Sequence, residues 1–513
     1  MKKTNIQDIP QDKFRLVQDD RPIYDAKIET KSISYFGDAM RRFSRNKASV
    51  AGAIIIMLVV IFSVTAPFIS PYKVSDVDGT YAKARPKLKL FEGTGFWDGH
   101  KTLRANDKYL IYLNGIGMAA ADHKAEGVDW QAGKDSAYSV VNSMTNPYFV
   151  SNKRYREVQV DSYYLEGFKY VNITEDQYED LKAWEDKEGL PVIYPMIDKS
   201  KSPLSENDAN YWFKMTNNGG ALNKAGKNME LEDVIAEGLV DNYLRDADGN
   251  VQYFTQRGGT MREVRVLNYN YYIYKNGHEP LHYLGSDVQG YDIFVRVAQG
   301  TRLSIVLAVL VSFVNLTIGA FYGAIQGYYG GAVDLIMDRI TDVISGMPFV
   351  VIATLFQLHL VMPGKVSAFE GILFAFFISG WIATASRVRT QFYRFKNEEY
   401  ILSARSMGAG DARLMLRHIF PNAIGTIITS SVLVIPGTIL SESSLSYIGV
   451  INFNSKEMTS LGTMLSNGQG YLASDPHILF VPAIIISLLM ISFNLFGNGL
   501  RDAFNPALRG SEE

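Results

Sequence analysis

Residues Glu398–Pro421 read EEYILSARSMGAGDARLMLRHIFP, a polar and basic segment between two apolar runs. The order of residue types predicts two short helices joined by a turn. Gly408 and Gly410 break the first helix, because glycine tolerates the backbone angles of a sharp turn. Asp411 is placed to cap the second helix, and Pro421 to end it, since proline has no amide proton for the helix ladder. We call residues 398–421 the elbow and expect something to dock on it.

The apolar runs around the elbow predict an α-helical polytopic membrane protein. A spanning helix needs roughly 20 apolar residues. Six candidate spans meet or approach this length: Ser49–Phe68, Leu303–Tyr322 (continuing to Gly327), Met347–Met362, Gly371–Thr384, Ala423–Leu440 and Ile478–Leu495.

Basic residues near the span ends predict the orientation, because cytoplasmic loops are enriched in Lys and Arg. Arg41, Arg42 and Arg45 precede the first span, and the loop Ser386–Asn422 is rich in arginine. Both termini and the elbow are therefore expected in the cytoplasm. Arg296 and Arg302 fall on the opposite side, and we expect them near an interfacial helix, Asp292–Gly300, lying along the lipid headgroups.

Composition divides the chain into five parts. The stretch before the first span is too long for the basic region of a secretory signal. The expected parts are a cytoplasmic N-terminal tail (1–48), the first membrane span (49–68), an extracytoplasmic inserted domain (73–284), a membrane core with five further spans and the elbow (285–498) and a cytoplasmic C-terminal tail (499–513). We call 73–284 the insert.

The insert is polar, tyrosine-rich and of mixed α+β pattern. Thr174 and Gln177 are placed as a capping box at the start of a helix. Alternation predicts strands, and Asp-Gly or Asn-Gly pairs predict hairpin turns. The predicted elements are a helix over Thr174–Glu188, strands over Asn250–Phe254 and Glu263–Tyr274, and turns at Asp248-Gly249 and Asn276-Gly277.

Several function classes are disfavoured by what the sequence lacks. A net charge of −2 gives no basic face for nucleic acid. No cysteine is present, so disulfides and thiol catalysis are excluded. The phosphate-loop pattern GxxxxGK[ST] and the HExxH and GxSxG motifs do not occur. We therefore expect no enzyme, no metal site and no cofactor on this chain.

Two further patterns concern helix packing and charge. Gly319, Gly323 and Gly327 recur every four residues and form a bare stripe that lets another helix approach closely. Asp334, Asp338 and Asp342 also lie four apart, with Arg339 among them. Since they fall between two predicted spans, on the cytoplasmic side, we expect a solvated or ion-paired surface rather than an ion pathway.

The elbow resembles the EAA loop of ABC importer permeases. With Gly408 on that loop's glycine, Pro421 falls on its proline, and the Glu-Ala-Ala positions fall on Leu402, Ser403 and Ala404. The acidic residue is thus missing, as is familiar in the oligopeptide and dipeptide branch. Further stretches, including YYGGAVDLIMDRITDVISGMPF, SESSLSYIGV and FNLFGNGLRDAFNPALRG, resemble its C-type subunit. The resemblance covers roughly 40–72 and 282–509, and the insert departs from it.

This resemblance implies a six-helix type I ABC importer permease fold with an inserted extracytoplasmic α+β domain, in a bacterial cell membrane. The implied partners are a second homologous permease subunit, two ATP-binding subunits that carry ATP and Mg, an extracytoplasmic peptide-binding protein, the peptide substrate and membrane lipid. The elbow would fit a cleft on one ATPase subunit and move with it. Residues expected to couple the two are Ser403, Ala404, Arg405, Gly408, Asp411, Arg413, Leu414, Met415, Arg417, Ile419 and Pro421, with the arginines making polar contacts and Leu414, Met415 and Ile419 apolar ones.

Two alternatives remain open at this point. The same family could import another solute, such as nickel or glutathione, because the sequence does not show which side chains face the pore. The chain could also be a membrane-anchored binding or signalling protein that acts through the insert. For the insert we expect either a docking platform for the binding protein, motivated by Tyr163, Tyr164, Tyr271, Tyr272 and Tyr274, or a structural domain.

Overall fold

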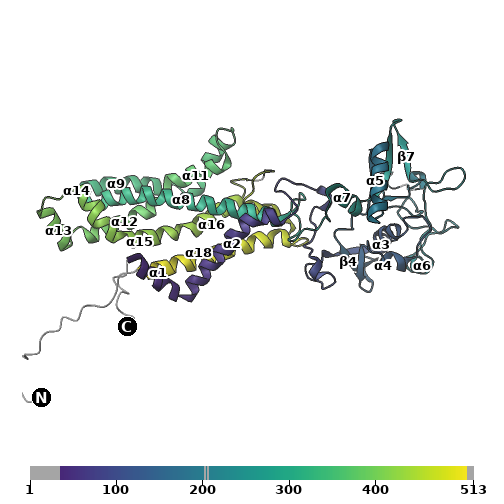
Figure 1. Cartoon of the computed structure of the whole chain (residues 1–513), viewed down its shortest axis with the longest axis horizontal. Helices are drawn as coiled ribbons and strands as arrows, with labels where there is room; N and C mark the ends of the chain where they lie inside the picture. Colours follow the sequence, from purple (N-terminus) through teal and green to yellow (C-terminus); the bar gives the residue numbers. More distant parts are fainter. Residues whose placement is uncertain (1–34, 202–203, 205–206, 454, 505–513) are drawn as a thin grey trace, which may run out of the picture.

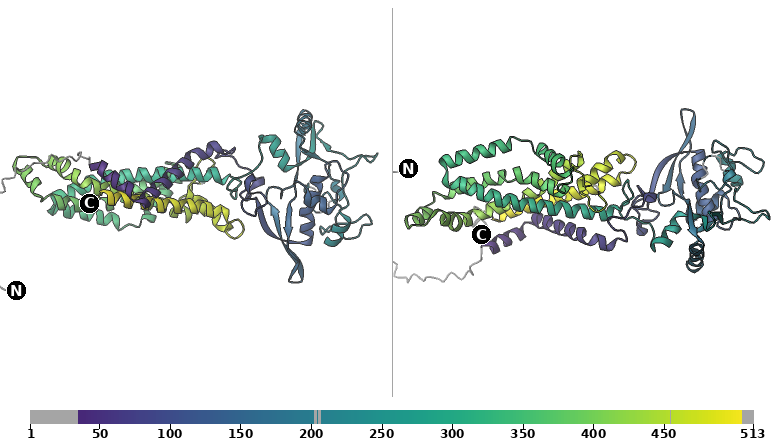
Figure 2. Two further views of the ribbon diagram at one scale, coloured as in Figure 1. Left: turned by 60° about the horizontal axis from the view of Figure 1, so that its bottom comes forward. Right: turned by 90° about the horizontal axis from the view of Figure 1, so that it is seen from above.

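The computed structural model describes residues 35–201, 204, 207–453 and 455–504. It consists of an elongated helical bundle with a sheet-containing domain at one end (Figure 1). Two further views show the same end-to-end arrangement (Figure 2). Of the two predicted tails, 1–34 and 505–513 lie outside the described residues.

The bundle is built from helices before and after the insert. The first two, α1 (Tyr35–Arg45) and α2 (Lys47–Ile69), pack against the last helix, α18 (His477–Phe504). Between the insert and α18 the elements are α8 (Ile293–Tyr329), α9 (Gly331–Ser345), α10 (Phe349–Phe356), η6 (Gln357–Val361), α11 (Ala368–Ser379), α12 (Ile382–Phe395), α13 (Glu399–Ser406), α14 (Asp411–Arg413), η7 (Leu414–Ile419), α15 (Phe420–Val432), α16 (Val434–Tyr447), α17 (Leu461–Gly468) and η8 (Gln469–Tyr471).

In the described part of the chain, five helices are long and apolar enough to cross a membrane: Lys47–Ile69, Ile293–Tyr329, Ala368–Phe395, Asp411–Tyr447 and His477–Phe504. A sixth crossing exists if Gly331–Ser345 and Phe349–Val361, which meet at a bend of 70°, form one span. Within the described residues the predicted third span, Met347–Met362, is thus only the second arm of a bent pair. The aspartate helix α9, expected between spans, is the first arm.

The predicted interfacial helix over Asp292–Gly300 is wrong. Asp292 caps α8, accepting the amide proton of Val295 at 2.9 Å, and the helix then runs unbroken for 37 residues. At 1.5 Å per residue it is about 55 Å long, well beyond a bilayer core. Arg296 is buried in it and donates to the Ser455 carbonyl at 2.9 Å. Arg296 therefore hydrogen-bonds to the protein backbone rather than to the lipid headgroups.

The glycine stripe of α8 faces α12 at very short range. A β-carbon on Gly323 would lie 2.2 Å from the Ala385 carbonyl oxygen, and one on Gly319 2.7 Å from the Thr384 side chain. On Gly327 it would lie 2.6 Å from the Arg389 carbonyl oxygen. Only glycine lets the two backbones come this close.

The aspartates of α9 are ion-paired, as predicted, but mainly with a distant residue. Arg389 of α12 contacts Asp334 at 2.7 Å and Asp338 at 3.1 Å. Arg339 forms an ion pair with Asp342 at 2.8 Å. The two contacts of Arg389 tie α9 to α12, whereas the Arg339–Asp342 pair lies within α9.

The insert contains two four-stranded antiparallel sheets within the described residues. In the first, β4 is central and pairs with β1, β2 and β3; in the second, β8 pairs with β5, β6 and β7. Its elements are η3 (Gly79–Tyr81), η4 (Lys89–Phe91), β1 (His100–Asn106), α3 (Asp107–Ala121), α4 (Trp130–Asp135), β2 (Val141–Met144), β3 (Tyr148–Val150), β4 (Lys153–Asp161), β5 (Phe168–Thr174), α5 (Glu175–Glu188), β6 (Ile193–Tyr194), η5 (Lys199–Lys201), α6 (Leu231–Glu237), β7 (Phe254–Arg257), β8 (Met261–Leu267) and α7 (Asn268–Asn276).

Local signals in the insert have mixed outcomes. The capping box is confirmed. The Thr174 hydroxyl accepts from the Gln177 amide at 3.3 Å, and the Gln177 side-chain oxygen accepts from the Thr174 amide at 3.1 Å. The predicted strand Glu263–Tyr274 is half right, because β8 ends at Leu267 and a helix follows. The hairpin at Asn276-Gly277 is wrong: Gly277 ends α7 in the left-handed conformation, which glycine adopts at helix ends as well as in hairpins.

The tyrosines offered as a docking surface are buried in, or half-buried against, the cores of the insert, which removes that motive for a docking platform. Tyr163 is 1% exposed and Tyr271 9% exposed. Tyr164 and Tyr272 pack on the cluster around Tyr163, and Tyr274 on the cluster around Tyr271. Aromatic rings carry a large apolar area, and here it is buried inside the insert.

Candidate coupling site at the far end of the bundle

The elbow lies at the end of the bundle opposite the insert (Figure 1). Its first helix, α13, stops at a turn in which Gly408 has a φ of +87°. The Ala409 amide donates to the Ala404 carbonyl at 3.1 Å, and the Gly408 amide to the Arg405 carbonyl at 2.9 Å. This pair of bonds is the Schellman motif, which requires a left-handed residue at the position of Gly408.

Gly410 has no such requirement, contrary to the prediction that both glycines are needed for the turn. Its φ is −73° and its ψ 160°, an extended conformation that any residue adopts. A β-carbon there would meet nothing within 4 Å. The turn therefore depends on Gly408 alone.

Asp411 is not the helix cap that the sequence suggested. Gly410 occupies that position without a side-chain bond, and Asp411 is the first residue of α14. Its carboxylate instead accepts the Tyr328 hydroxyl proton at 2.6 Å. Arg405 donates to the same hydroxyl oxygen at 3.3 Å. Both arms of the elbow are thus tied to the end of α8 through one buried tyrosine.

Pro421 does not end the second helix. After α14 the chain forms a π-helix, η7, and continues as α15 with Pro421 in its first turn. The Phe420 amide donates five residues back, to Met415. Proline is tolerated in the first turn of a helix, where its missing amide proton breaks no bond. The elbow therefore leads directly into a membrane-crossing helix.

Leu414 and Ile419 are wrong as apolar contacts for a partner, because both are 0% exposed. They pack with Val388, Phe392 and Ile401 in a cluster that fastens the elbow to α12. Met415 is half-buried against the same cluster. Ala404 is also buried, whereas Ser403 and Arg405 are exposed.

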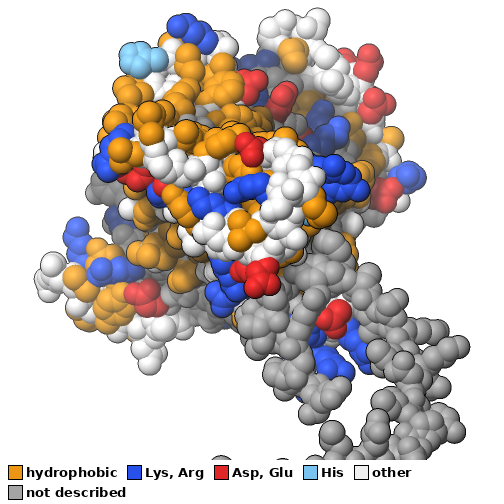
Figure 3. All heavy atoms as spheres, turned by 90° about the vertical axis from the view of Figure 1, so that its left-hand side faces the viewer, with side chains coloured by type: hydrophobic (Ala, Val, Ile, Leu, Met, Phe, Trp, Pro, Cys, Tyr) orange, Lys and Arg blue, Asp and Glu red, His pale blue; other side chains and the backbone are white. Residues whose placement is uncertain are grey.

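Other apolar side chains face outward on the elbow. Met407 is 81% exposed, Leu416 61% and Leu402 46%. Arg413 and Arg417 are exposed as well, and neither forms an ion pair with the described part of the chain. Viewed onto this end, hydrophobic and basic side chains lie side by side (Figure 3). We call Leu402, Met407, Arg413, Leu416 and Arg417 the elbow face.

A second set of contacts fixes the two chain segments on either side of the elbow. Lys396, just after α12, donates to the carbonyls of Gly327 at 3.1 Å and Tyr328 at 3.4 Å. A cation at the C-terminus of a helix satisfies its free carbonyls. Asn422 joins the two arms by donating to the Tyr400 hydroxyl at 3.1 Å and to the His418 carbonyl at 2.8 Å. The elbow is thus held at several points.

Comparison with known proteins decides the family. Residues 315–510 match the model of the binding-protein-dependent transport system inner membrane component, and residues 34–86 match the N-terminal TM domain of oligopeptide transport permease C. The chain is 40% identical over 228 residues to the oligopeptide transport system permease protein OppC of Bacillus subtilis (strain 168), covering 44% of this chain and 72% of that protein. The chain belongs to the OppC/DppC-type permease family. It is therefore a permease subunit of the ABC importers of the peptide and glutathione group, and a multi-pass membrane protein.

Two other relatives define the breadth of this family. The dipeptide transport system permease protein DppC of Bacillus subtilis (strain 168) is 36% identical over 229 residues, 44% of this chain and 69% of that one. The glutathione transport system permease protein GsiD of Pectobacterium atrosepticum is 34% identical over 243 residues, 47% of this chain and 78% of that one. Both sheets of the insert fall between the two ranges that the OppC/DppC-type family models match.

Sequence reasoning missed Tyr328 and the exposed apolar residues of the elbow face. Tyr328 lies 83 residues from Asp411 along the chain, so no local pattern joins them. Met407, immediately before the turn glycine, was recognisable as a position outside the helix. Which face of α14 and η7 points inward depended on packing against α12.

Proposed function

We propose that this permease passes peptides delivered by an extracytoplasmic binding protein, and that ATP hydrolysis on two separate ATP-binding subunits drives it through the elbow. A second homologous permease completes the pathway. The elbow and both termini face the cytoplasm, and the insert faces the opposite side of a bacterial cell membrane. No ATP, Mg or other cofactor is assigned to this chain.

The observation that carries the proposal is the elbow face. The elbow exposes apolar Met407 and Leu402 as well as arginines, a mix of side chains of the kind found at protein interfaces. Leu416 is exposed too, at the edge of an apolar hollow that α8 and α15 line. This surface sits on a glycine-fixed turn that continues into a spanning helix. A force on the elbow therefore reaches the membrane segment without passing through a flexible linker.

Nucleotide acts in this scheme by choosing between conformations. ATP changes the balance between two permease conformations only if the ATP-bound subunits bind the elbow more tightly in one conformation than in the other. The links from Tyr328 to Asp411 and Arg405 carry that preference to α8.

Growth on defined peptides as the sole source of a required amino acid tests the transport role. With the gene, peptide-dependent growth and uptake of labelled peptide are expected; without it, both are lost, while growth on the free amino acid is unchanged. Co-purification from membranes should recover ATP-binding and second permease subunits. Uptake that persists without the gene, or a chain that works alone, would contradict the proposal.

A second candidate substrate is glutathione, itself a small peptide, because a glutathione permease is among the relatives at 34% identity. Competition separates the two. If oligopeptides are the substrate, uptake of labelled oligopeptide should depend on the gene and resist excess unlabelled glutathione; if glutathione is the substrate, uptake of labelled glutathione should depend on the gene and resist excess oligopeptide.

A further inference from the structure

One segment of the insert gathers several exposed apolar side chains. This segment, Leu88–Trp97, we call the aromatic loop. Leu90 is 86% exposed and Phe96 61% exposed. The ring of Phe96 lies 5.9 Å from that of Phe91 and 4.9 Å from that of Trp97. The result is an outward apolar cluster on a domain whose other aromatic rings are largely in its core.

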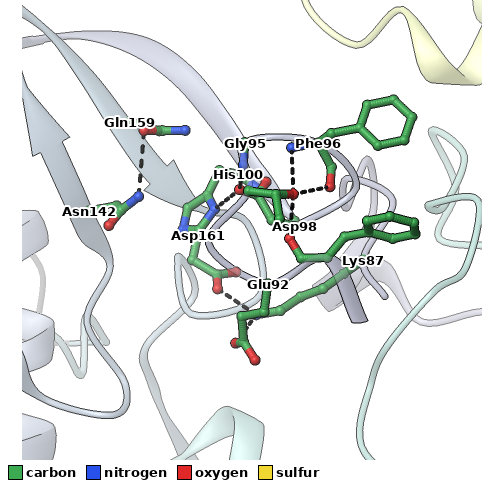
Figure 4. A network of polar contacts seen from close by, with 12 residues as sticks. Lys87, Glu92, Gly95, Phe96, Asp98, His100, Asn142, Gln159 and Asp161 are labelled. Atoms are coloured by element: carbon green, nitrogen blue, oxygen red, sulfur yellow. Dashed lines mark hydrogen bonds and ion pairs between the residues drawn. The ribbon is translucent and has the colours of Figure 1, made fainter. Parts of the chain in front are cut away.

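The base of the aromatic loop is held in a fixed shape (Figure 4). Leu88 donates its amide proton to the Trp97 carbonyl at 2.9 Å, which closes the loop. Asp98 accepts from the Gly95 amide at 2.9 Å and from the His100 amide at 3.1 Å. Buried Lys87 contacts Asp161 at 2.7 Å and Glu92 at 3.8 Å. The exposed rings are therefore presented by a braced loop.

The loop lies beside the end of the first membrane helix. Pro71, two residues beyond the last residue of α2, lines with Leu88 and Leu90 a hollow of about 490 Å³. The end of α2 is itself exposed, with Phe68 at 85% and Ile69 at 61%. The segment just after α2 and the aromatic loop thus line one hollow, together with charged residues such as Lys89 and Glu279.

We propose that the aromatic loop rests in the headgroup layer of the membrane leaflet next to the insert, and that its partner is the phospholipid bilayer. Tryptophan is enriched at this depth because its ring is amphipathic, and the loop contains Trp97, which is half-buried. Lys89, within the loop, is exposed and pairs with Glu279 at 2.8 Å, and Lys73, between α2 and the loop, is exposed as well; both can meet lipid phosphates. Leu90 and Phe96 provide the part that enters the acyl boundary, as at other interfacial segments.

The contact fixes the insert relative to the membrane at a second point. The first is the covalent connection through α2 and α8, where Tyr72 stacks on His282 at 4.3 Å and His282 contacts Asp292 at 2.8 Å. Together with the contacts of Arg85 to Ser474 and Asp475, just before α18, these attachments restrict rocking of the insert over the bundle. The proposal needs only that the chain spans the membrane and does not depend on the identity of its substrate.

Single cysteines test this in the full chain, which has none of its own. Leu90→Cys and Phe96→Cys variants, labelled with an environment-sensitive fluorophore, are reconstituted into vesicles of phosphatidylcholine and phosphatidylglycerol. The matched control is Phe149→Cys, 71% exposed on β3. Quenching is measured with lipids carrying doxyl groups at the headgroup or upper acyl chain, and with iodide in the water.

For positions 90 and 96 we expect a blue shift of emission, strong quenching by the doxyl lipids and loss of iodide quenching, whereas position 149 shows the reverse. Equal behaviour of all three labels would overturn the proposal. Labels at 90 and 96 that escape both quenchers would also overturn it, because they would then be covered by protein. The binding protein or the second permease, added in turn, would identify that protein.

Discussion

The elbow and the insert treat the same kinds of side chain in opposite ways. In the insert, tyrosines and tryptophans are packed in the core, and Arg265, fully buried, donates to the carbonyls of Ala209 and Pro195 at 2.7 and 3.1 Å. In the elbow, Met407 and Leu416 face outward beside exposed arginines. Apart from the aromatic loop and a few other exposed positions such as Phe149, the insert buries its large apolar side chains, whereas the elbow leaves several of them exposed. This difference supports the proposal that another chain completes the elbow surface.

The largest effect is expected from breaking the insert's core. Burial lowers the pKa of the Arg265 guanidinium, and its stem and head fill space over the Phe168 ring at 3.8 Å. Arg265→Ala leaves two buried carbonyls without donors and opens a cavity, which together cost about 3–5 kcal/mol. Thermal unfolding and limited proteolysis of the purified chain measure this.

The control is Arg245→Ala, because the Arg245 side chain is 41% exposed. It should change the unfolding free energy by less than about 0.5 kcal/mol. If Arg265→Ala unfolds like the parent chain, the insert is not the self-sufficient domain that its contacts indicate.

The next effect concerns the link between the elbow and α8. Tyr328→Phe removes the hydroxyl that Asp411 and Arg405 share. A hydrogen bond to a charged group contributes about 1.5–3 kcal/mol, so peptide uptake should fall by roughly 10- to 100-fold. Basal ATP hydrolysis by the complex should persist, because the change lies outside the ATP-binding subunits.

Tyr329→Phe is the matched control, since Tyr329 is its neighbour and 52% exposed. Uptake should then equal that of the parent. A Tyr328→Phe complex with normal uptake per ATP hydrolysed would mean that the hydroxyl link does not transmit motion.

A smaller effect is expected from the turn itself. Gly408→Ala places a side chain at a φ of +87°, where an L-residue costs about 1–2 kcal/mol. Uptake should drop by roughly 5- to 30-fold. Gly410→Ala should be nearly silent, because its φ is −73° and no atom lies within 4 Å of the added carbon. Equal loss in the two variants would show that the turn geometry is not the cause.

The smallest effect is a pH dependence at the base of the aromatic loop. Burial alone would raise the pKa of Asp98, but hydrogen bonds from the His100 ring and from the amides of His100 and Gly95 outweigh it and hold the pKa below its ordinary value. The ionised form is therefore favoured in the folded loop. Its stabilisation is present above the ordinary aspartate pKa of about 4 and is lost as the pH falls through the lowered value.

A nitroxide at Phe96→Cys reports this loss as increased mobility below that pH. The Asp98→Asn variant should remove the change with pH, and a nitroxide at Phe149→Cys should not show it. Mobility that rises instead with increasing pH would contradict the assigned sign.

The sequence was sufficient to predict the features that depend on residues close together in the chain. The spans, the turn at Gly408 and the capping box of Thr174 each depend on a few neighbouring residues. The partner of Asp411 did not follow from sequence, because Tyr328 is far along the chain. The burial of Leu414 and Ile419 depends on how η7 packs against α12. The helix continues past Pro421 because a π-helix precedes it, which no residue pattern indicated.

Site-directed cross-linking tests the central claim that another chain completes the elbow face. Met407→Cys and Leu416→Cys, each the only cysteine of the chain, are modified with a maleimide–benzophenone reagent in membranes holding the assembled transporter. Phe149→Cys in the insert is the control. Adducts to an ATP-binding subunit are predicted at both elbow positions, with yields that change when ATP and vanadate are added, and none at position 149. Co-purification of the ATP-binding subunits without any elbow adduct would contradict the account.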